Sequence, residues 1–320
     1  MKRSVFTAIA CGLLSTFAAA APDWPTRPVR IIVPFAAGAT PDVVARLVVD
    51  DLQDKLQQPF IVENRPGAGG NTGTDAVAKA VPDGATLGIS IGGPLAVNTL
   101  LFSNLPYDPR KDLTLITTLA TQPSALAVNV SLGVNTTREL IDLIRRNAGK
   151  YAFGSIGTGS LSHLAMEAIA LKSGTQLVHV PYASSPQAMT ALIRNDVQMV
   201  CLPAMAVVPQ LGSGTVKILA VSTAERSALL PDIATLKEAG IDVEADAWNG
   251  LIGPAGLPDA MVTRIGSQVA GALNSRAIRE KLTAQLMEPI PDTPAKFRTR
   301  IDADIARWAP VIEAAKIKMD

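Results

Sequence analysis

The chain has 320 residues, of which 48% are hydrophobic and 18% are charged, and its formal net charge is +1 at pH 7. This composition favours a folded protein with a sizeable core, and the lack of a basic cluster argues against nucleic acid as a partner. A chain of this length exceeds what one hydrophobic core usually supports, so two domains are expected.

Residues 1–20 have the pattern of a secretory signal peptide, with Lys2 and Arg3 followed by an apolar segment and small residues. The apolar segment is shorter than the roughly 20 residues of a membrane span, so we expect an exported, periplasmic protein. A lipoprotein anchored through Cys11 is a minor alternative. Only Cys201 lies beyond the leader, so the mature chain can form no intrachain disulfide.

The mature chain is predicted to begin with a strand, a loop of small residues and a helix. Residues 29–33 form a β-branched apolar run that Pro34 ends. Thr40 is the expected N-cap, with Pro41 at the first helical position and apolar residues at helical spacing after it. Free N–H groups and the positive end of the helix dipole then face the loop, which favours an anion such as a carboxylate.

Other elements alternate along the chain in an α/β pattern. Short buried strands are expected at residues 60–63, 86–91, 125–129, 151–154, 177–181, 197–202 and 216–222, and helices at 138–147, 161–172, 186–194 and 261–274. Residues 113–120 are a plausible strand crossing into a second lobe, and the return is expected between residues 222 and 250.

The second lobe repeats the arrangement of strand, permissive loop and capped helix. Gly157 and Gly159 lie in the loop, and Ser160 or Ser162 is the expected N-cap of the following helix. A third helix start follows residues 182–185. Two lobes that present helix N-termini to each other predict a cleft that closes on a small acid.

Motifs for catalysis and cofactors are weak. No glycine-x-serine-x-glycine elbow, dinucleotide fingerprint, Walker lysine or metal-ligand spacing is present, so neither cofactor nor metal is expected. His179 lies within an apolar strand and favours a core role. His163 is better placed to bind a ligand, although capping or packing is about equally favoured. Asp42 is most simply a carboxylate that complements the helix dipole, with a ligand ammonium or a water as alternative partners.

Two segments, IVPFAAG at 32–38 and VENRPGAGGNTG at 62–73, resemble the Bug, or tripartite tricarboxylate transporter, family of extracytoplasmic substrate-binding proteins. The likeness continues at residues 82–84, 105–109, 154–155, 162–164, 178–182 and 254–256, and so covers nearly the whole mature chain. The run from Glu63 to Gly73 is highly specific to that family.

The resemblance implies a type 2 periplasmic-binding fold of two α/β lobes with a ligand cleft between them. We expect residues 21–122 and 224–320 in lobe 1 and 123–223 in lobe 2, a monomer, and delivery of a small carboxylate to a membrane permease. Family positions that hold the ligand through amides, hydroxyls and waters match Phe35, Ala36, Ala37, Gly38, Ala39, Thr40, Ser155, Gly157, Thr158, Gly159, Ser160, His163, Tyr182, Ala183 and Ser184 here. Gly92, Gly93 and Trp248 are expected at the cleft edge, and Asp42 and Leu202 nearby.

Several positions depart from the family pattern. Ala39 replaces a usual second glycine, which is expected to restrict the loop. Ala183 and Leu202 are apolar where relatives often carry charge, which favours a ligand with an apolar or aromatic body. Binding is expected to depend on Thr158 and Ser160 more than on any lysine or arginine. A ligand-presenting sensor, or an enzyme that uses His163 and a cleft serine, are the alternatives.

Overall fold

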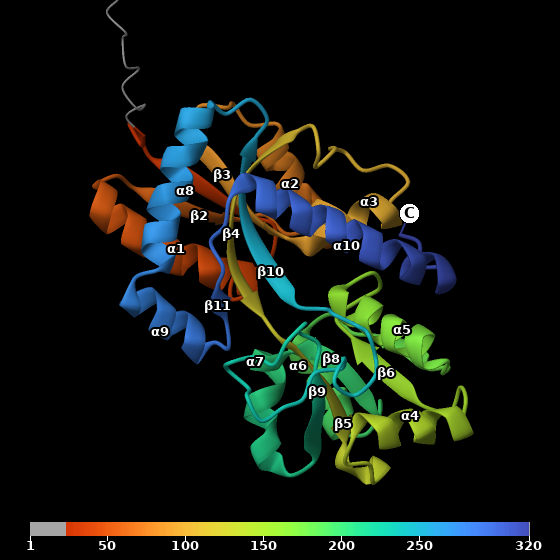
Figure 1. Cartoon of the computed structure of the whole chain (residues 1–320). Coiled ribbons are helices and arrows are strands. Elements are labelled where there is room, and N and C mark those ends of the chain that lie inside the picture. The colour runs from red at the N-terminus through yellow and green to blue at the C-terminus, as the bar shows by residue number, and fades with distance from the viewer. Residues whose placement is uncertain (1–23, 320) are drawn as a thin grey trace, which may run out of the picture.

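The computed structural model describes residues 24–319, so the predicted signal peptide lies outside the described residues. Two β-sheets form the cores of two lobes (Figure 1). The chain passes from the first lobe to the second at Pro123, between β4 (Leu113–Gln122) and β5 (Ser124–Asn129), and it returns through β10 (Ala247–Pro254). The predicted two-lobe α/β fold is confirmed.

Lobe 1 is built on a sheet in the order β11-β4-β10-β3-β1-β2. The strands β1 (Val29–Val33), β2 (Phe60–Asn64) and β3 (Thr86–Ile91) are parallel, whereas β10 runs antiparallel to β3 and β4. The short β11 (Glu288–Pro289) adds to β4 at one edge. The helices of this part of the chain are α1 (Thr40–Leu56), α2 (Asn71–Ala78), α3 (Asn98–Leu101), α8 (Asp259–Leu273), α9 (Arg276–Ala284) and α10 (Pro294–Ala314).

Lobe 2 has a sheet in the order β7-β6-β8-β5-β9, with β5 antiparallel to both of its neighbours. Its remaining strands are β6 (Ala152–Ser155), β7 (Val178–Pro181), β8 (Met199–Pro203) and β9 (Val216–Val221). Its helices are α4 (Thr137–Arg146), α5 (Leu161–Ser173), α6 (Ser185–Ile193) and α7 (Ala204–Val207). Each strand and helix predicted by range is present, with ends displaced by a few residues.

The predicted lobe boundary at residue 224 is too early. Leu236, Ile241, Val243 and Ala245 are buried in the same apolar cluster as Phe153 of β6. The stretch between β9 and β10 therefore packs on lobe 2, because its apolar side chains find their partners there.

The last helix joins the two lobes and was not predicted from the sequence. Phe297 and Ile301, in its first half, pack with lobe 1 residues. Trp308 and Val311, in its second half, are buried in a cluster that joins lobe 2 residues with Val97 and Leu101 of lobe 1. Figure 1 shows α10 running from the lobe 1 sheet toward α5. The end of α10 therefore packs on both lobes.

Gly73 in α2 provides a test of packing in the segment of residues 62–73. A Cβ at this position would lie 2.6 Å from the Cα of Pro34 and 2.8 Å from the carbonyl oxygen of Arg65, both backbone atoms. We expect Gly73→Ala to lower the free energy of unfolding by about 1–3 kcal/mol, because overpacking against backbone is not easily relieved.

Urea unfolding of both variants measures this effect. The matched control is Gly271→Ala in α8, where a Cβ meets nothing within 4 Å and helix propensity alone predicts a gain of up to about 1 kcal/mol. Equal stability changes in the two variants would refute the packing argument.

Candidate functional site

The loop between β1 and α1 is held by a side chain that the sequence analysis assigned differently. Ala39, not Thr40, is the N-cap residue, and it makes no side-chain capping bond. Thr40 is the first helical residue, so its predicted role as N-cap is wrong. Asp42 instead secures the turn, since its Oδ2 accepts the Gly38 N–H at 2.8 Å.

Asp42 is 2% exposed and both of its oxygens are occupied. Arg46 donates to Oδ2 and Oδ1 at 3.0 Å each, and Asn64 donates to Oδ1 at 2.9 Å. Burial acts to raise the pKa of Asp42, but the hydrogen bonds from Arg46, Gly38 and Asn64 outweigh it and leave the pKa lowered. The carboxylate therefore shapes the loop, and a direct contact with a ligand is disfavoured.

The Ala39 departure from the family pattern does not strain this loop. Ala39 has φ −68° and ψ 156°, an ordinary extended conformation that any residue adopts. The left-handed position is Gly38, at φ +80°. The expected restriction from the lost glycine is therefore absent at residue 39.

Three N–H groups of the first loop, those of Ala36, Ala37 and Thr40, donate to no acceptor among residues 24–319. Ala36 and Ala37 are exposed, and Thr40 is half-buried in the first turn of a 17-residue helix. Unpaired amides at a helix N-terminus attract anions, because the helix dipole adds to each N–H.

The loop after β6 caps the next long helix. Ser160 is its N-cap: Oγ accepts the His163 N–H at 3.3 Å and donates to the Gly157 carbonyl at 2.6 Å. This structural use leaves Ser160 poorly placed to bind a ligand by its side chain. Thr158 is exposed, and neither its N–H nor its hydroxyl has a partner in the part of the chain that the structure describes. Thr158 is the stronger candidate.

Two histidines lie behind this loop, and the sequence analysis assigned only His163 to it. His163 and His179 stack with ring centroids 3.7 Å apart. Nδ1 of His163 accepts the Gly159 N–H at 3.1 Å, and Nε2 of His179 lies 2.6 Å from the Ser155 hydroxyl. The prediction of a core role for His179 missed this contact with the loop.

These contacts define the protonation of the pair. Acceptance by Nδ1 leaves the proton of neutral His163 on Nε2, which lies 3.5 Å from the Glu167 carboxylate. Burial, together with the neighbouring His163, lowers the pKa of His179 to about 4. His163 is 4% exposed and supports the loop from the interior, and His179 beside it is half-buried.

The third predicted segment follows β7 and touches the second. The Tyr182 N–H donates to the Ser155 carbonyl at 2.9 Å, and the Ala183 N–H donates to Oε1 of Gln187 at 3.1 Å. Ala183 is exposed, while Tyr182 and Ser184 are half-buried. The hydroxyl of Ser184 has no partner within the described chain and remains available to a ligand.

Two further predicted ligand contacts, Leu202 and Trp248, are buried in apolar clusters. Leu202 is 0% exposed and packs in the apolar cluster of β8, α6 and α7, so its predicted contact with a ligand is wrong for this arrangement. Trp248 is 3% exposed, its Nε1 donates to Asp304 at 2.8 Å, and its ring meets Phe297 edge to face. Its predicted place at the cleft edge is likewise wrong.

Gly92 and Gly93 are half-buried where β3 ends. A Cβ at Gly92 would lie 3.3 Å from Trp248 and Asp304, so this glycine lets the backbone pass close above the indole.

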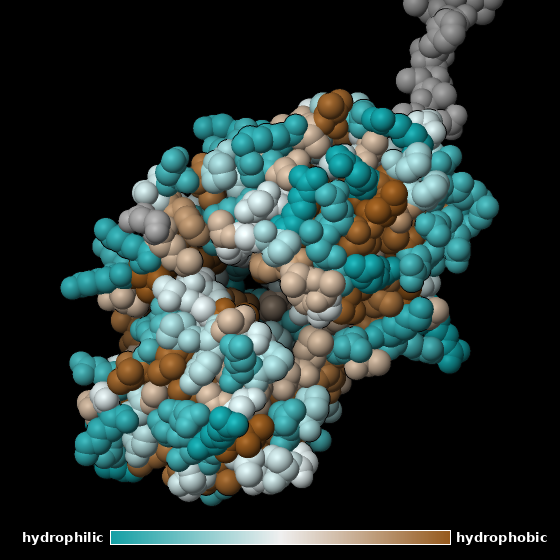
Figure 2. Space-filling view, turned by 180° about the vertical axis from the view of Figure 1, so that it is seen from behind, coloured by the Kyte–Doolittle hydropathy of each residue, from teal (hydrophilic) through white to brown (hydrophobic). Residues whose placement is uncertain are grey.

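The lobes face each other across a hollow that is visible in Figure 2. Thr40 of lobe 1 and Met205 of lobe 2 approach at this junction, with Oγ1 and Sδ 3.8 Å apart. A Cβ at Gly159 would lie 2.5 Å from Leu101 and 2.8 Å from Met319. The lobe 2 loop therefore packs against lobe 1 and the C-terminal segment.

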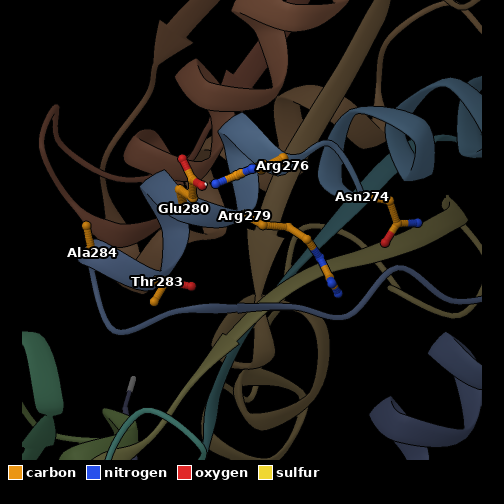
Figure 3. A pocket seen from close by; sticks show the side chains of 6 residues that line it. All are labelled: Asn274, Arg276, Arg279, Glu280, Thr283 and Ala284. Atoms are coloured by element: carbon orange, nitrogen blue, oxygen red, sulfur yellow. Dashed lines mark hydrogen bonds and ion pairs between the residues drawn. The ribbon is translucent and has the colours of Figure 1, made fainter.

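A separate depression of about 510 Å³ lies on the outside of lobe 1 (Figure 3). Arg276 and Glu280 form an ion pair of 2.7 Å at its rim. It contains none of the predicted ligand residues. In residues 24–319 no cluster of three or more His, Cys, Asp or Glu side chains is arranged to hold a metal, and no helix has the length and apolarity of a membrane span.

Comparison with known proteins finds similar sequences and structures over most of the chain. A family model described as tripartite tricarboxylate transporter family receptor matches residues 44–317. Protein BugT of Bordetella pertussis is 34% identical over 301 residues, which cover 93% of this chain and 92% of the relative.

Two solved structures are similar over their whole length. Rpa4515 of R. palustris with adipate has a TM-score of 0.83 and 34% identity, covering 92% of this chain and 99% of the other. MatC from Rhodopseudomonas palustris with bound malate has a TM-score of 0.77 and 30% identity, covering 90% and 100%.

The depressed pKa of His179 predicts a pH dependence of stability. Between its ordinary pKa of 6.5 and its folded pKa of about 4, the unfolded chain binds a proton that the folded chain does not. The stabilisation from neutral His179 is therefore complete above pH 6.5 and is lost as the pH falls toward 4.

We expect the free energy of unfolding of wild type and His179→Gln to converge between neutral pH and pH 5, measured by urea titration. Groups that make no contact with His179 titrate alike in both proteins and cancel in the difference, so the change reports the stacked pair of His179 and His163. A difference that stays constant over this range would contradict the assignment.

Proposed function

The chain belongs to the family of tripartite tricarboxylate transporter receptors, and from this premise we propose that it captures a small carboxylate between its lobes and delivers it to a membrane permease. The predicted leader at residues 1–20 places this role in the periplasm. The permease partner follows from the family and from export.

The observation that carries the proposal is the set of unpaired donors at two helix starts. Ala36, Ala37 and Thr40 offer free N–H groups at α1, and Thr158 offers a free N–H and hydroxyl before α5. The three loops at residues 34–40, 155–160 and 182–185 contain no lysine or arginine. Neutral donors and helix dipoles therefore supply the attraction for the anion.

The positive charge of Arg46, beside the first loop, is already balanced by a carboxylate. Arg46 pairs with the buried Asp42 at 3.0 Å. This pairing matters because an uncompensated Asp42 at the start of α1 would repel an incoming carboxylate.

Relatives support the size of the proposed ligand. Adipate and malate are the molecules named with the two similar structures, and both are short dicarboxylates. We propose the same chemical class for this chain.

The contact between Ser155 and His179 resembles part of a catalytic dyad, yet its geometry favours support over chemistry. Ser155 is 0% exposed, and its Oγ also accepts the Gly157 N–H at 3.2 Å. A substrate cannot reach this hydroxyl, so we propose that the bound acid is released unchanged. A sensor would use the same site, and the family favours transport.

Thr158→Val tests the proposal by isothermal titration with adipate and malate. A hydrogen bond to a charged group contributes about 1.5–3 kcal/mol, so the variant should bind about 10- to 100-fold more weakly while melting at an unchanged temperature. The control is Thr299→Val, which removes an exposed hydroxyl on α10 away from the loops.

Chromatography of the ligand after incubation with pure protein tests for turnover. Conversion of the acid, or failure of every short dicarboxylate to bind, would overturn the proposal.

A further inference from the structure

Two buried amide side chains lie side by side at the junction of the lobes. Gln122 is the last residue of β4 and pairs with Ala247 of β10, and Asn249 pairs with Ala120. The register is regular from the pair of Gln122 and Ala247 to the pair of Ala120 and Asn249, so both amides lie on the same face of the sheet as diagonal neighbours. Such neighbours are about 7–8 Å apart between Cα atoms, within reach of one small molecule.

Each of these amides has a carbonyl oxygen without a donor. Gln122 is 1% exposed and Asn249 is 2% exposed. Within residues 24–319, Oε1 of Gln122 and Oδ1 of Asn249 have no hydrogen-bond partner. A buried polar atom left unpaired costs about 1–3 kcal/mol, so two on neighbouring strands call for a partner.

The orientation of the Gln122 amide follows from its neighbour. Oγ1 of Thr40 donates toward Sδ of Met205 at 3.8 Å, which leaves the oxygen free to accept from Nε2 of Gln122 at 3.1 Å. The NH₂ group therefore faces Thr40, and Oε1 points away from it. The unpaired oxygen is an acceptor that awaits a donor.

This acceptor pair lies beside the proposed carboxylate site. Thr40, which Gln122 contacts, is the first residue of α1 and has one of the free N–H groups. A ligand held by those amides thus has its neighbouring atoms near the two oxygens. The contact between Thr40 and Met205 spans the lobes, so separation of the lobes opens the way to the pair.

We propose that Oε1 of Gln122 and Oδ1 of Asn249 form a second subsite that accepts hydrogen bonds from a hydroxyl or ammonium group carried close to the ligand's carboxylate. The inference rests on the proposed function and narrows its ligand class. A donor-bearing short acid satisfies both oxygens, whereas a second carboxylate meets two like partial charges there.

This proposal reverses the expectation of an apolar-bodied ligand. That expectation depended on Ala183 and Leu202, and Leu202 is fully buried in the core of lobe 2. The two amides were not singled out from the sequence, because nothing in their neighbourhood along the chain marks them as a pair.

The test compares acids that differ in one donor. Succinate, L-malate and L-aspartate share a four-carbon chain, and malate and aspartate add a hydroxyl and an ammonium group. By isothermal titration of the mature protein, we expect malate or aspartate to bind at least about tenfold more tightly than succinate, as one to two added hydrogen bonds predict.

Two variants assign that preference to the oxygens. Gln122→Met and Asn249→Leu should each weaken binding of the donor-bearing acid about three- to tenfold more than they weaken binding of succinate. Asn249 makes no hydrogen bond to Thr40 within the described chain, whereas Gln122 does. Asn249→Leu therefore removes an acceptor without removing the bond to Thr40. Gln285→Met, an exposed site at the end of α9, is the matched control and should change nothing.

The outcomes are distinguishable. Equal binding of succinate, malate and aspartate by wild type overturns the subsite and leaves the proposed function intact. If both variants still prefer malate or aspartate to succinate, other residues bind the hydroxyl or ammonium group. That result also overturns the assignment of the subsite to the two amide oxygens. Failure of all three acids and of adipate to bind overturns both proposals.

Discussion

Backbone N–H groups that have no partner within residues 24–319, at the starts of α1 and α5, are the feature on which the proposed site depends. A loop whose amides are free needs some other means of holding its shape. In lobe 1 that means is Asp42, which binds Gly38, Arg46 and Asn64 and spares the amides of Ala36 and Ala37. The carboxylate is buried and neutralised, so it fixes the turn without repelling an anion.

Lobe 2 solves the same problem with two stacked histidine rings. His163 takes the Gly159 N–H and His179 lies against the Ser155 hydroxyl, so the loop is held from its inner side. The exposed side of the loop, at Thr158, stays free. Burial and the neighbouring His163 lower the pKa of His179, which avoids placing a titrating cation beneath the site at neutral pH.

Contacts between the lobes limit how the site can open. Besides the crossings before β5 and before β10, the helix α10 buries Phe297 with lobe 1 and Trp308 with lobe 2. The Met319 N–H donates to the Leu101 carbonyl at 3.0 Å, and both residues lie against Gly159. The lobe 2 loop is thus supported from lobe 1 and from the chain end, while the Thr40 and Met205 contact is a single weak one.

Local sequence determined the strands, most helices and the free amides, because each depends on side-chain periodicity or on one or two neighbouring residues. It narrowed the cap of α5 to Ser160 or Ser162, and the structure selects Ser160. The segment at residues 62–73, which is specific to the family, predicted the two-lobe fold. Tertiary structure alone decided the rest. Ser155 and His179 are 24 residues apart, and Gln122 and Thr40 are 82 apart, so no local pattern pairs them. Leu202 and Trp248 were misplaced because a strand's periodicity shows which side chains alternate, while which face meets the cleft depends on the helices that cover it. The lobe boundary was misplaced for a similar reason, since the apolar residues after β9 fit either core by composition and only packing assigns them to one.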